Sequence, residues 1–364
     1  MKKPSLSIVI PTYNEKDNIS KILEKLKEAL KGITHEIIFV DDNSPDETSR
    51  EIKFFMRRSS NIRLVHRIGR RGLSGAVIEG FFAANSELVA VMDCDLQHDE
   101  TKLSDMLDLF SKSASLDIVI ASRFTEEGEI SDIAFSKFRK LGSKITTFLV
   151  KKLLNINSSD PLSGFFMAKK ETFLRSTDKL QTQGFKILAD FLATEGKNIE
   201  IKEIGYKFKN RIAGESKMSF LTALELIGLV FSQVFRGRVS IRFILFCMVG
   251  LSGIFVQLLI TGASMFFINQ FPTAQTLGII AAMTSNYFLN NSITFKERKL
   301  KSFELMRGLF SFYLICSLGA FTNVAIASYI FDFSSNWLIS SFIGAVFGAI
   351  WNFTLTSIFT WKSK

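Results

Sequence analysis

Short, continuous apolar runs alternate with amphipathic stretches along the first half of the chain. The runs are rich in β-branched side chains, as buried parallel strands are, and they lie at residues 6–10, 37–40, 88–92 and 117–121. Between them, residues 18–30, 46–57 and 73–84 place apolar side chains three and four positions apart, which is typical of helices that cover a sheet. This order predicts a doubly wound α/β domain.

The second half of the chain has a different pattern, because charged residues almost vanish from it. Residues 243–295 contain no Asp, Glu, Lys or Arg, and residues 308–361 contain only Asp332. Each block is long enough for two membrane spans. We therefore expect an all-α domain of four transmembrane helices, at residues 243–268, 276–295, 308–331 and 337–361.

Two segments after the predicted strands have patterns of their own: the first is basic and amphipathic, and the second is mostly apolar. Residues 138–154 carry five basic side chains among apolar ones, and residues 220–235 form an apolar stretch with Glu225 near its middle. Both are expected to lie at a membrane surface, the alternative being ordinary helices packed on the first domain. The predicted division is 1–219 for the α/β domain, 220–242 for an interfacial helix and linker, and 243–364 for the membrane domain.

Basic residues flank the predicted spans unevenly, and this sets their expected orientation. Arg236, Arg238 and Arg242 precede the first span, basic residues within 296–301 join the second to the third, and Lys362 and Lys364 follow the fourth. Positive-inside then predicts an integral membrane protein with both termini and the first domain in the cytoplasm. The same residues account for part of the net charge of +10, and no nucleic-acid-binding motif accompanies it.

The predicted spans also repeat at an offset of 66 residues. Gly253 then corresponds to Gly319, and Asn286 corresponds to Asn352. A lipid-handling role and simple duplication of an anchor explain the repeat equally well. For the amides of Asn286, Asn290 and Asn352, hydrogen bonds between helices are expected, because an amide in an apolar span needs a partner.

Polar clusters follow three of the predicted strands, at residues 11–15, 41–44 and 93–97. Ligands of doubly wound sheets bind at the carboxyl ends of the strands, so the three clusters should meet. Asp93 and Asp95 supply the hard oxygen ligands that suit Mg²⁺ or Mn²⁺, and Gln97 can add a carbonyl oxygen. A lone Asp-X-Asp is often a solvated turn, but its position directly after a buried strand favours a site for the metal and diphosphate of a nucleotide sugar.

Taken together, the motifs carry a family resemblance. Residues 11–15 (Pro-Thr-Tyr-Asn-Glu), 40–46, 93–98, 160–165 and 214–217 resemble the motifs of the dolichyl-phosphate mannose synthases, which are inverting family 2 glycosyltransferases of the GT-A, Rossmann-like fold. The four predicted spans resemble the small GtrA-like membrane domain. The sequence departs from the family at Cys94, where alanine is usual, at Asp99, where prolines are usual, and at Ala213, where some relatives carry arginine.

The resemblance implies roles for individual residues. The nucleoside of the donor would be held by Pro11, Tyr13, Glu15, Val40 and Asp42. Asp93, Asp95 and Gln97 would hold the metal and the diphosphate, with Cys94 and Lys217 also at the donor. The residues expected to take part in catalysis are Asp95, Arg123, Arg139, Ser143 and Arg211, the last four around the phosphates of donor and acceptor.

The implied reaction is transfer of a hexose, with inversion, from a nucleotide sugar to dolichyl or another polyprenyl phosphate. Mannose from GDP-mannose is implied first, and a UDP-glucose-dependent undecaprenyl-phosphate glucosyltransferase is the alternative. A processive polysaccharide synthase is disfavoured, since residues 233–237 match only two positions of its Gln-X-X-Arg-Trp motif. A lipid-linked sugar flippase is an alternative of a different class. Asp190 is assigned a structural or orienting role, and His98 is noted because it adjoins Gln97; oligomeric state stays open.

Overall fold

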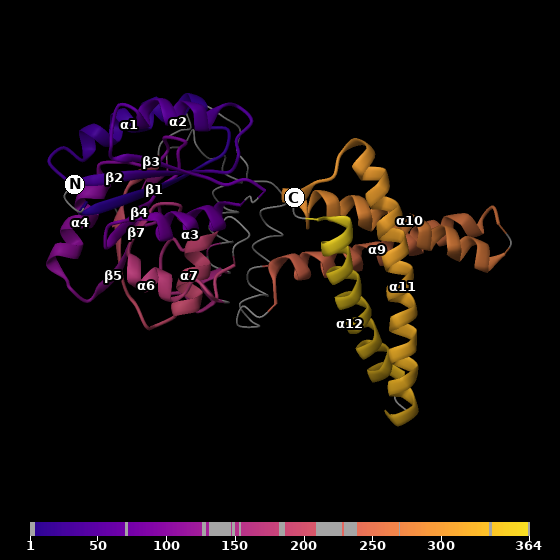
Figure 1. Cartoon of the computed structure of the whole chain (residues 1–364). Coiled ribbons are helices and arrows are strands. Elements are labelled where there is room, and N and C mark those ends of the chain that lie inside the picture. Colours follow the sequence, from indigo (N-terminus) through magenta and orange to yellow (C-terminus); the bar gives the residue numbers. More distant parts are fainter. Residues whose placement is uncertain are drawn as a thin grey trace. The chain divides into compact units, whose positions relative to one another are not determined.

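The computed structural model divides the chain into two compact units, Met1–Ile241 and Arg242–Lys364, which are described separately here (Figure 1). The residues that the structure describes are 4–69, 72–125, 129–130, 147, 150–152, 154–181, 186–208, 228, 239–268, 270–334 and 337–362. The predicted surface segments at 138–154 and 220–235 lie almost wholly outside these ranges.

A seven-stranded mixed sheet forms the centre of the first unit. Its order is β3-β2-β1-β4-β7-β5-β8, and only β7 runs antiparallel to its neighbours. The strands are β1 Leu6–Thr12, β2 His35–Asp41, β3 Ile62–His66, β4 Leu88–Val91, β5 Leu116–Ser122, β7 Phe166–Lys169 and β8 Glu200–Gly205. A separate short pair joins β6, Glu129–Ile130, to β9, Lys207–Phe208.

The four strands predicted from apolar runs, now β1, β2, β4 and β5, are confirmed. The other three strands of this sheet were not predicted, for reasons that lie in their sequences, and neither was the short pair of β6 and β9. The edge strands β3 and β8 contain charged residues, and they lack the continuous apolar run of a strand buried on both faces. The third, β7, has four residues, which is too short for a periodic signal.

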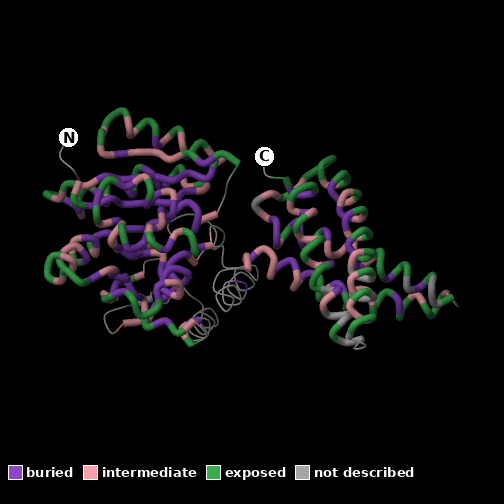
Figure 2. The backbone as a smooth tube through the Cα atoms, turned by 60° about the horizontal axis from the view of Figure 1, so that its bottom comes forward, coloured by how far each residue is buried: buried purple, intermediate pink, exposed green. Residues whose placement is uncertain are grey.

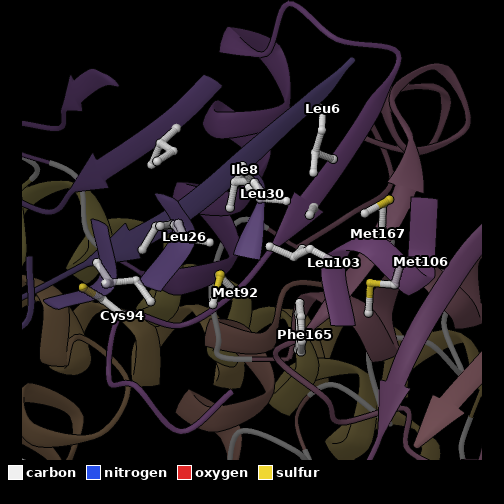
Figure 3. Close-up of a cluster of buried hydrophobic side chains, with 14 of the residues drawn as sticks. Leu6, Ile8, Leu26, Leu30, Met92, Cys94, Leu103, Met106, Phe165 and Met167 are labelled. Carbon is white, nitrogen blue, oxygen red and sulfur yellow. The ribbon is translucent and has the colours of Figure 1, made fainter. Parts of the chain in front are cut away.

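Helices cover both faces of the sheet, as a doubly wound domain requires. They are α1 Lys16–Ala29, α2 Thr48–Met56, α3 Leu73–Ala83, α4 Lys102–Lys112, α6 Lys170–Arg175 and α7 Ile187–Glu195. Ile8 of β1 packs in one core cluster with side chains of α1, α2 and α4 (Figure 3). Val9 points to the opposite face, where Gly80 of α3 lies against it. Figure 2 shows the strands buried between helices whose outer surfaces are exposed.

The second unit is helical. Its helices are α9 Ile241–Met265, α10 Phe271–Ser292, α11 Ser302–Ser334 and α12 Trp337–Leu355, with a 3-10 turn at Lys296–Arg298 and a π-helical turn at Thr356–Thr360. Within the described part of the chain, two segments are long and apolar enough to cross a membrane, Ile241–Met265 and Ser302–Thr322. In α10, polar residues such as Gln275, Asn286 and Asn290 lower the apolar content. Four spans therefore remain a prediction.

The repeat seen in the sequence has matching contacts in the structure. A Cβ on Gly253 would lie 2.6 Å from Oδ1 of Asn286, and a Cβ on Gly319 would likewise collide with Asn352. The expected hydrogen bonds are wrong for these two amide oxygens, since neither Oδ1 has a partner among the described residues. Each amide instead lies against a helix that has a glycine at the contact. Asn290 accepts a hydrogen bond from Thr294 at 2.7 Å within its own helix and connection.

Aromatic rings join the two copies of the repeat. Phe295 stacks on Trp361, with ring centroids 4.3 Å apart, and these two residues are equivalent at the 66-residue offset. Tyr287 stacks on Trp361, and the equivalent pair, Phe353 on Phe295, is stacked too. Such exchanged pairs are what a two-fold relation between two similar halves produces.

Candidate active site

The polar clusters after β1, β2 and β4 lie side by side, because β2, β1 and β4 are neighbours in the sheet and run parallel. Thr12 pairs with Asp41 in the register of β1 and β2. The expectation that three strand ends meet is thus confirmed. The arrangement follows from the fold, since parallel strands present all their carboxyl ends at one edge.

Backbone turns after β1 and β2 are tied to each other by side-chain acceptors. The N–H of Asn14 donates to Oγ of Ser44 at 3.0 Å, and the N–H of Glu15 donates to Oγ1 of Thr48 at 3.0 Å. Asn14 and Asn43 have φ of 58° and 54°, a left-handed conformation that asparagine tolerates better than most residues. The two turns therefore form one connected surface.

The residues implied to hold the nucleoside differ in exposure. Tyr13 and Glu15 are half-buried, and Glu15 accepts a hydrogen bond from Asn18 at 2.7 Å. Pro11 is buried, and Val40 is fully buried in β2. Val40 lies within the sheet beneath this surface, and its contact with a nucleoside stays a prediction from the resemblance.

Asp42 forms a buried ion pair that the sequence did not predict. Nη1 of Arg67 donates to Oδ1 of Asp42, and the N–H of Gly72 donates to Oδ2 at 2.7 Å. Arg67 also donates to Glu79 of α3 at 3.1 Å. Burial raises the pKa of Asp42, while Arg67 and the Gly72 N–H oppose that rise. Asp42 thus fixes the start of α3 in addition to any contact with a nucleoside.

Arg67 carries one signal that could have revealed it. It is a basic residue directly after β3, a strand that includes apolar residues and pairs with β2. Because β3 was not recognised as a strand, its strand-end residue was missed with it.

The Asp-Cys-Asp segment follows β4 as predicted. Asp95 is 7% exposed, and its Oδ1 accepts the N–H of Gln97 at 3.2 Å. Asp93 is the more accessible of the pair, with a side chain 39% exposed. Cys94 lies in the apolar core, and burial raises the pKa of its thiol well above the ordinary value, as do the carboxylates nearby. Its thiol therefore packs in the core, and a role for Cys94 at the donor stays a prediction from the resemblance.

The carboxylates fit a divalent cation that is shared with a substrate. Within the described ranges, no group of three or more His, Cys, Asp or Glu side chains is placed to hold a metal alone. Magnesium is commonly bound by one or two carboxylates together with substrate phosphates and water, so a protein site of two carboxylates is adequate. Asp93 and Asp95 are the side chains that would provide it, and Gln97 lies next to them.

Gly164 approaches Asp93 from the segment that precedes β7. A Cβ at this glycine would lie 2.7 Å from Oδ2 of Asp93, closer than van der Waals contact permits. The segment is fixed in turn by Ser163, whose Oγ donates to the carbonyl of Ala121 at 2.8 Å. Only glycine leaves Asp93 room in its present position.

Arg123 is held by Asp160 through a two-pronged ion pair. Nε and Nη2 of Arg123 donate to the two carboxylate oxygens at 2.7 and 2.8 Å, and its backbone N–H donates at 3.2 Å. Burial would lower the pKa of Arg123, but the hydrogen bonds and charge of Asp160 outweigh burial and raise it. Arg123 is thus a fixed cation, and Asp160 takes two of its three guanidinium nitrogens.

The remaining predicted residues divide into two groups. Asp190 is 2% exposed on α7, and its Oδ2 accepts the N–H of Gln181 at 2.6 Å, which agrees with an orienting role. The others lie outside the described residues, so the structure does not place them: Arg139, Ser143, Arg211 and Lys217.

The fold defines a doubly wound α/β protein, a class whose ligands bind at the carboxyl ends of the strands, where these polar side chains gather. Comparison with known proteins makes the class specific. Residues 7–175 match the family described as glycosyl transferase family 2, and residues 245–361 match the GtrA/DPMS transmembrane domain.

A relative from Pyrococcus furiosus, named dolichol-phosphate mannosyltransferase, is 30% identical over 98% of this chain and 99% of its own length. A Saccharomyces cerevisiae protein of the same name is 30% identical over 58% of this chain and 80% of its own. This chain belongs to the dolichol-phosphate mannosyltransferase family of glycosyltransferases. Together with the apolar helices α9 and α11, the transmembrane domain match makes it a membrane protein.

Solved structures support the fold. Glucosyl-3-phosphoglycerate synthase from Mycobacterium tuberculosis, in complex with phosphoglyceric acid, superposes with a TM-score of 0.50 over 63% of this chain and 80% of its own. The same enzyme in complex with Mg²⁺ and uridine diphosphate also gives 0.50, over 63% and 79%. At 16% identity this likeness concerns the fold alone.

Proposed function

We propose that this chain transfers mannose from GDP-mannose, with inversion, to dolichyl or another polyprenyl phosphate. The observation that supports this most strongly is similarity to the Pyrococcus dolichol-phosphate mannosyltransferase over nearly the full length of both chains, membrane domain included. The strand-end carboxylates Asp93 and Asp95 give the proposal a chemical basis.

The acceptor needs little help from a protein base. A phosphate monoester has a second pKa of about 6, so at neutral pH it is largely dianionic and can attack the anomeric carbon directly. The task of the protein is then to bring two anions together. Arg123 suits this task, because Asp160 fixes its guanidinium through Nε and Nη2. Among the described residues Nη1 has no acceptor, so it can donate to a phosphate oxygen.

Asp93 and Asp95 are proposed to bind Mg²⁺ or Mn²⁺ together with the donor diphosphate. The bound cation would stabilise the negative charge that develops on the departing nucleoside diphosphate. Burial and the hydrogen bond from the N–H of Gln97 hold the Asp95 carboxylate in one position, as a metal ligand requires. Asp42 is proposed to contribute to the nucleoside side, and Arg139, Ser143, Arg211 and Lys217 stay predictions from the resemblance.

The proposed orientation puts the α/β domain and both termini in the cytoplasm. Basic residues at 236–242, at 296–301 and after Trp361 support it, because they would all lie on one side of four spans. On that side the site can meet a nucleotide sugar made in the cytoplasm and a lipid phosphate in the membrane.

The test offers radiolabelled GDP-mannose and UDP-glucose, side by side, to membranes that contain the full chain and polyprenyl phosphate. We expect label from GDP-mannose in the organic extract, loss of that label with a chelator, and its return with Mg²⁺ or Mn²⁺. Asp95→Asn should reduce transfer by at least about a hundredfold, as loss of an electrostatic stabiliser does.

Each alternative has its own outcome. Label from UDP-glucose alone would replace the proposed donor with that of a glucosyltransferase. A folded Asp95→Asn protein with undiminished transfer would refute the proposed metal site. Movement of a lipid-linked sugar across liposomes, with no turnover of either nucleotide sugar, would favour a flippase.

A further inference from the structure

His98 is a buried histidine that the proposed reaction does not use, and it contacts Asp93 twice. The backbone N–H of Asp93 donates to Nδ1 of His98 at 3.2 Å. Nε2 of the same ring lies 3.7 Å from Oδ2 of Asp93. Because Nδ1 accepts a hydrogen bond, the proton of the neutral ring is on Nε2, the nitrogen nearer the carboxylate.

The ring of His98 is itself held in place by aromatic neighbours. It is 2% exposed and stacks on Phe165, with centroids 5.1 Å apart and planes 12° apart. Tyr206 meets it edge-on at 5.9 Å, and Phe208 lies 6.1 Å away. A ring packed on several sides has little freedom to turn, so its Nδ1 is a fixed acceptor.

Asp93 is therefore constrained from two directions. His98 fixes its backbone from within its own turn, while Gly164, one residue before Phe165, allows the carboxylate to lie against the neighbouring segment. Asp93 needs such support because its side chain is 39% exposed, whereas Asp95 is buried.

We propose that His98 is a positioning residue for the metal site: its Nδ1 fixes the Asp-Cys-Asp turn so that the Asp93 carboxylate is preorganised for the cation. Partners of this kind orient the groups that bind a metal, and their loss commonly costs 10- to 100-fold in affinity. This proposal rests on the proposed metal-binding role of Asp93 and Asp95. It assigns His98 no proton transfer and no direct contact with substrate.

The test measures binding of Mn²⁺ by electron paramagnetic resonance, with GDP present and without an acceptor, so no turnover is needed. His98→Asn and His98→Leu form a matched pair, since both remove the ring and have similar size, but only asparagine offers an acceptor oxygen near the position of Nδ1. We expect His98→Leu to bind Mn²⁺ about tenfold more weakly than His98→Asn. His98→Phe, which keeps a ring for stacking and lacks the acceptor, should be weakened like His98→Leu.

Equal Mn²⁺ affinity in His98→Leu, His98→Asn and the wild-type protein would overturn the proposal. So would normal affinity in His98→Phe, because ring packing alone would then suffice. His35→Asn is the control, since His35 begins β2 at the opposite end of the sheet and contacts the carbonyl of Ile33. Asp95→Asn distinguishes failure of the metal site from failure of the His98 proposal. If Asp95→Asn binds Mn²⁺ normally, the proposed metal site is wrong. If Asp95→Asn binds Mn²⁺ weakly while all the His98 variants bind it normally, only the role of His98 is wrong.

Discussion

Gly164 and Asp93 illustrate how a single missing methyl group can shape this site. The carboxylate occupies space that a Cβ at residue 164 would need, since the distance would be 2.7 Å. The contact joins two segments about seventy residues apart, and no local pattern around either residue signals it. The backbone before β7 therefore limits where the outer carboxylate of the pair can lie.

Gly164→Ala should displace the Asp93 carboxylate and weaken Mn²⁺ binding roughly 10- to 100-fold, with a parallel fall in transfer. The measurement is Mn²⁺ titration of the full chain with GDP present. Gly32→Ala is the control: at φ +85° it is strained, but open space surrounds it in the α1–β2 connection. It should lower the melting temperature and leave Mn²⁺ affinity unchanged. Normal Mn²⁺ affinity in Gly164→Ala would contradict this prediction, because the backbone before β7 would then have shifted to make room for the methyl group.

Glu36 stabilises the other end of the sheet by accepting several hydrogen bonds. Its carboxylate receives Ser7 Oγ at 2.6 Å, Arg63 Nη1 at 2.8 Å and both nitrogens of Asn85. Burial tends to raise the pKa of Glu36, but these donors together outweigh burial and lower it below 4.5. A carboxyl with a lowered folded-state pKa stabilises the protein above its unfolded pKa, and that stability is lost as pH falls through the folded value.

Glu36→Gln should therefore destabilise the first unit by about 1.5–3 kcal/mol at pH 7, the value of hydrogen bonds to a charged group. The deficit should shrink as the pH falls below 4.5, where the unfolded carboxyl becomes protonated, and vanish below the lower pKa of the folded state. The measurement is thermal unfolding of the solubilised chain across about pH 3.5–7. This range runs from about one unit below the ordinary Glu pKa to neutrality. Glu24→Gln, on the exposed side of α1, is the control. A deficit independent of pH would refute the role of ionisation.

At the scale of elements, the helices of the membrane unit are joined by glycine and asparagine contacts that occur twice. Gly253 of α9 meets Asn286 of α10, and Gly319 of α11 meets Asn352 of α12. Small residues let helix backbones approach closely where no hydrophobic force drives them together. Asn291, by contrast, makes the hydrogen bonds between elements that were expected of Asn286: its side chain bonds to the backbone of Leu300 and to the Trp361 indole.

Gly253→Ala should destabilise the packing of α9 on α10 by about 1–3 kcal/mol, as overpacking of a close contact does. The measurement is the temperature at which the detergent-solubilised chain loses its folded state. Gly250→Ala, three residues earlier in α9, faces open space and should have little effect. Equal melting temperatures for the two variants would contradict the close contact.

At the scale of the molecule, an α/β domain and a helical membrane domain are joined in one chain that matches a relative over nearly its whole length. The exchanged aromatic pairs around Phe295 and Trp361 show that the helical unit is built from two similar halves. Two parallel halves of two spans each would bring the loop at 296–301 and the C-terminal segment to the same side. Both segments contain basic residues.

The orientation can be tested with single cysteines in a chain whose Cys94, Cys247 and Cys316 are replaced. Lys362→Cys should react with a membrane-impermeant maleimide only in inverted vesicles, and Gln270→Cys, between α9 and α10, only in vesicles of the opposite orientation. Labelling of both positions from the same side would contradict three crossings between them, by α10, α11 and α12, and hence the four predicted spans.

By itself, the sequence determined the features that repeat over short distances. Apolar runs and helical spacing identified four strands, three helices and the apolar membrane segments, because these patterns reflect which face of each element is buried. It also placed Asp93 and Asp95 just after a strand, because that strand has a recognisable pattern. The edge strands were missed, since their sequences lack that pattern.

Only the tertiary structure decided which distant residues meet. Arg67 pairs with Asp42 because β3 lies beside β2, and Gly164 faces Asp93 because β7 inserts antiparallel beside β4. His98 is fixed because Phe165 and Tyr206, far apart in the sequence, are brought together around its ring. Such contacts depend on strand order and on the space left between side chains, and neither quantity is encoded in a local pattern.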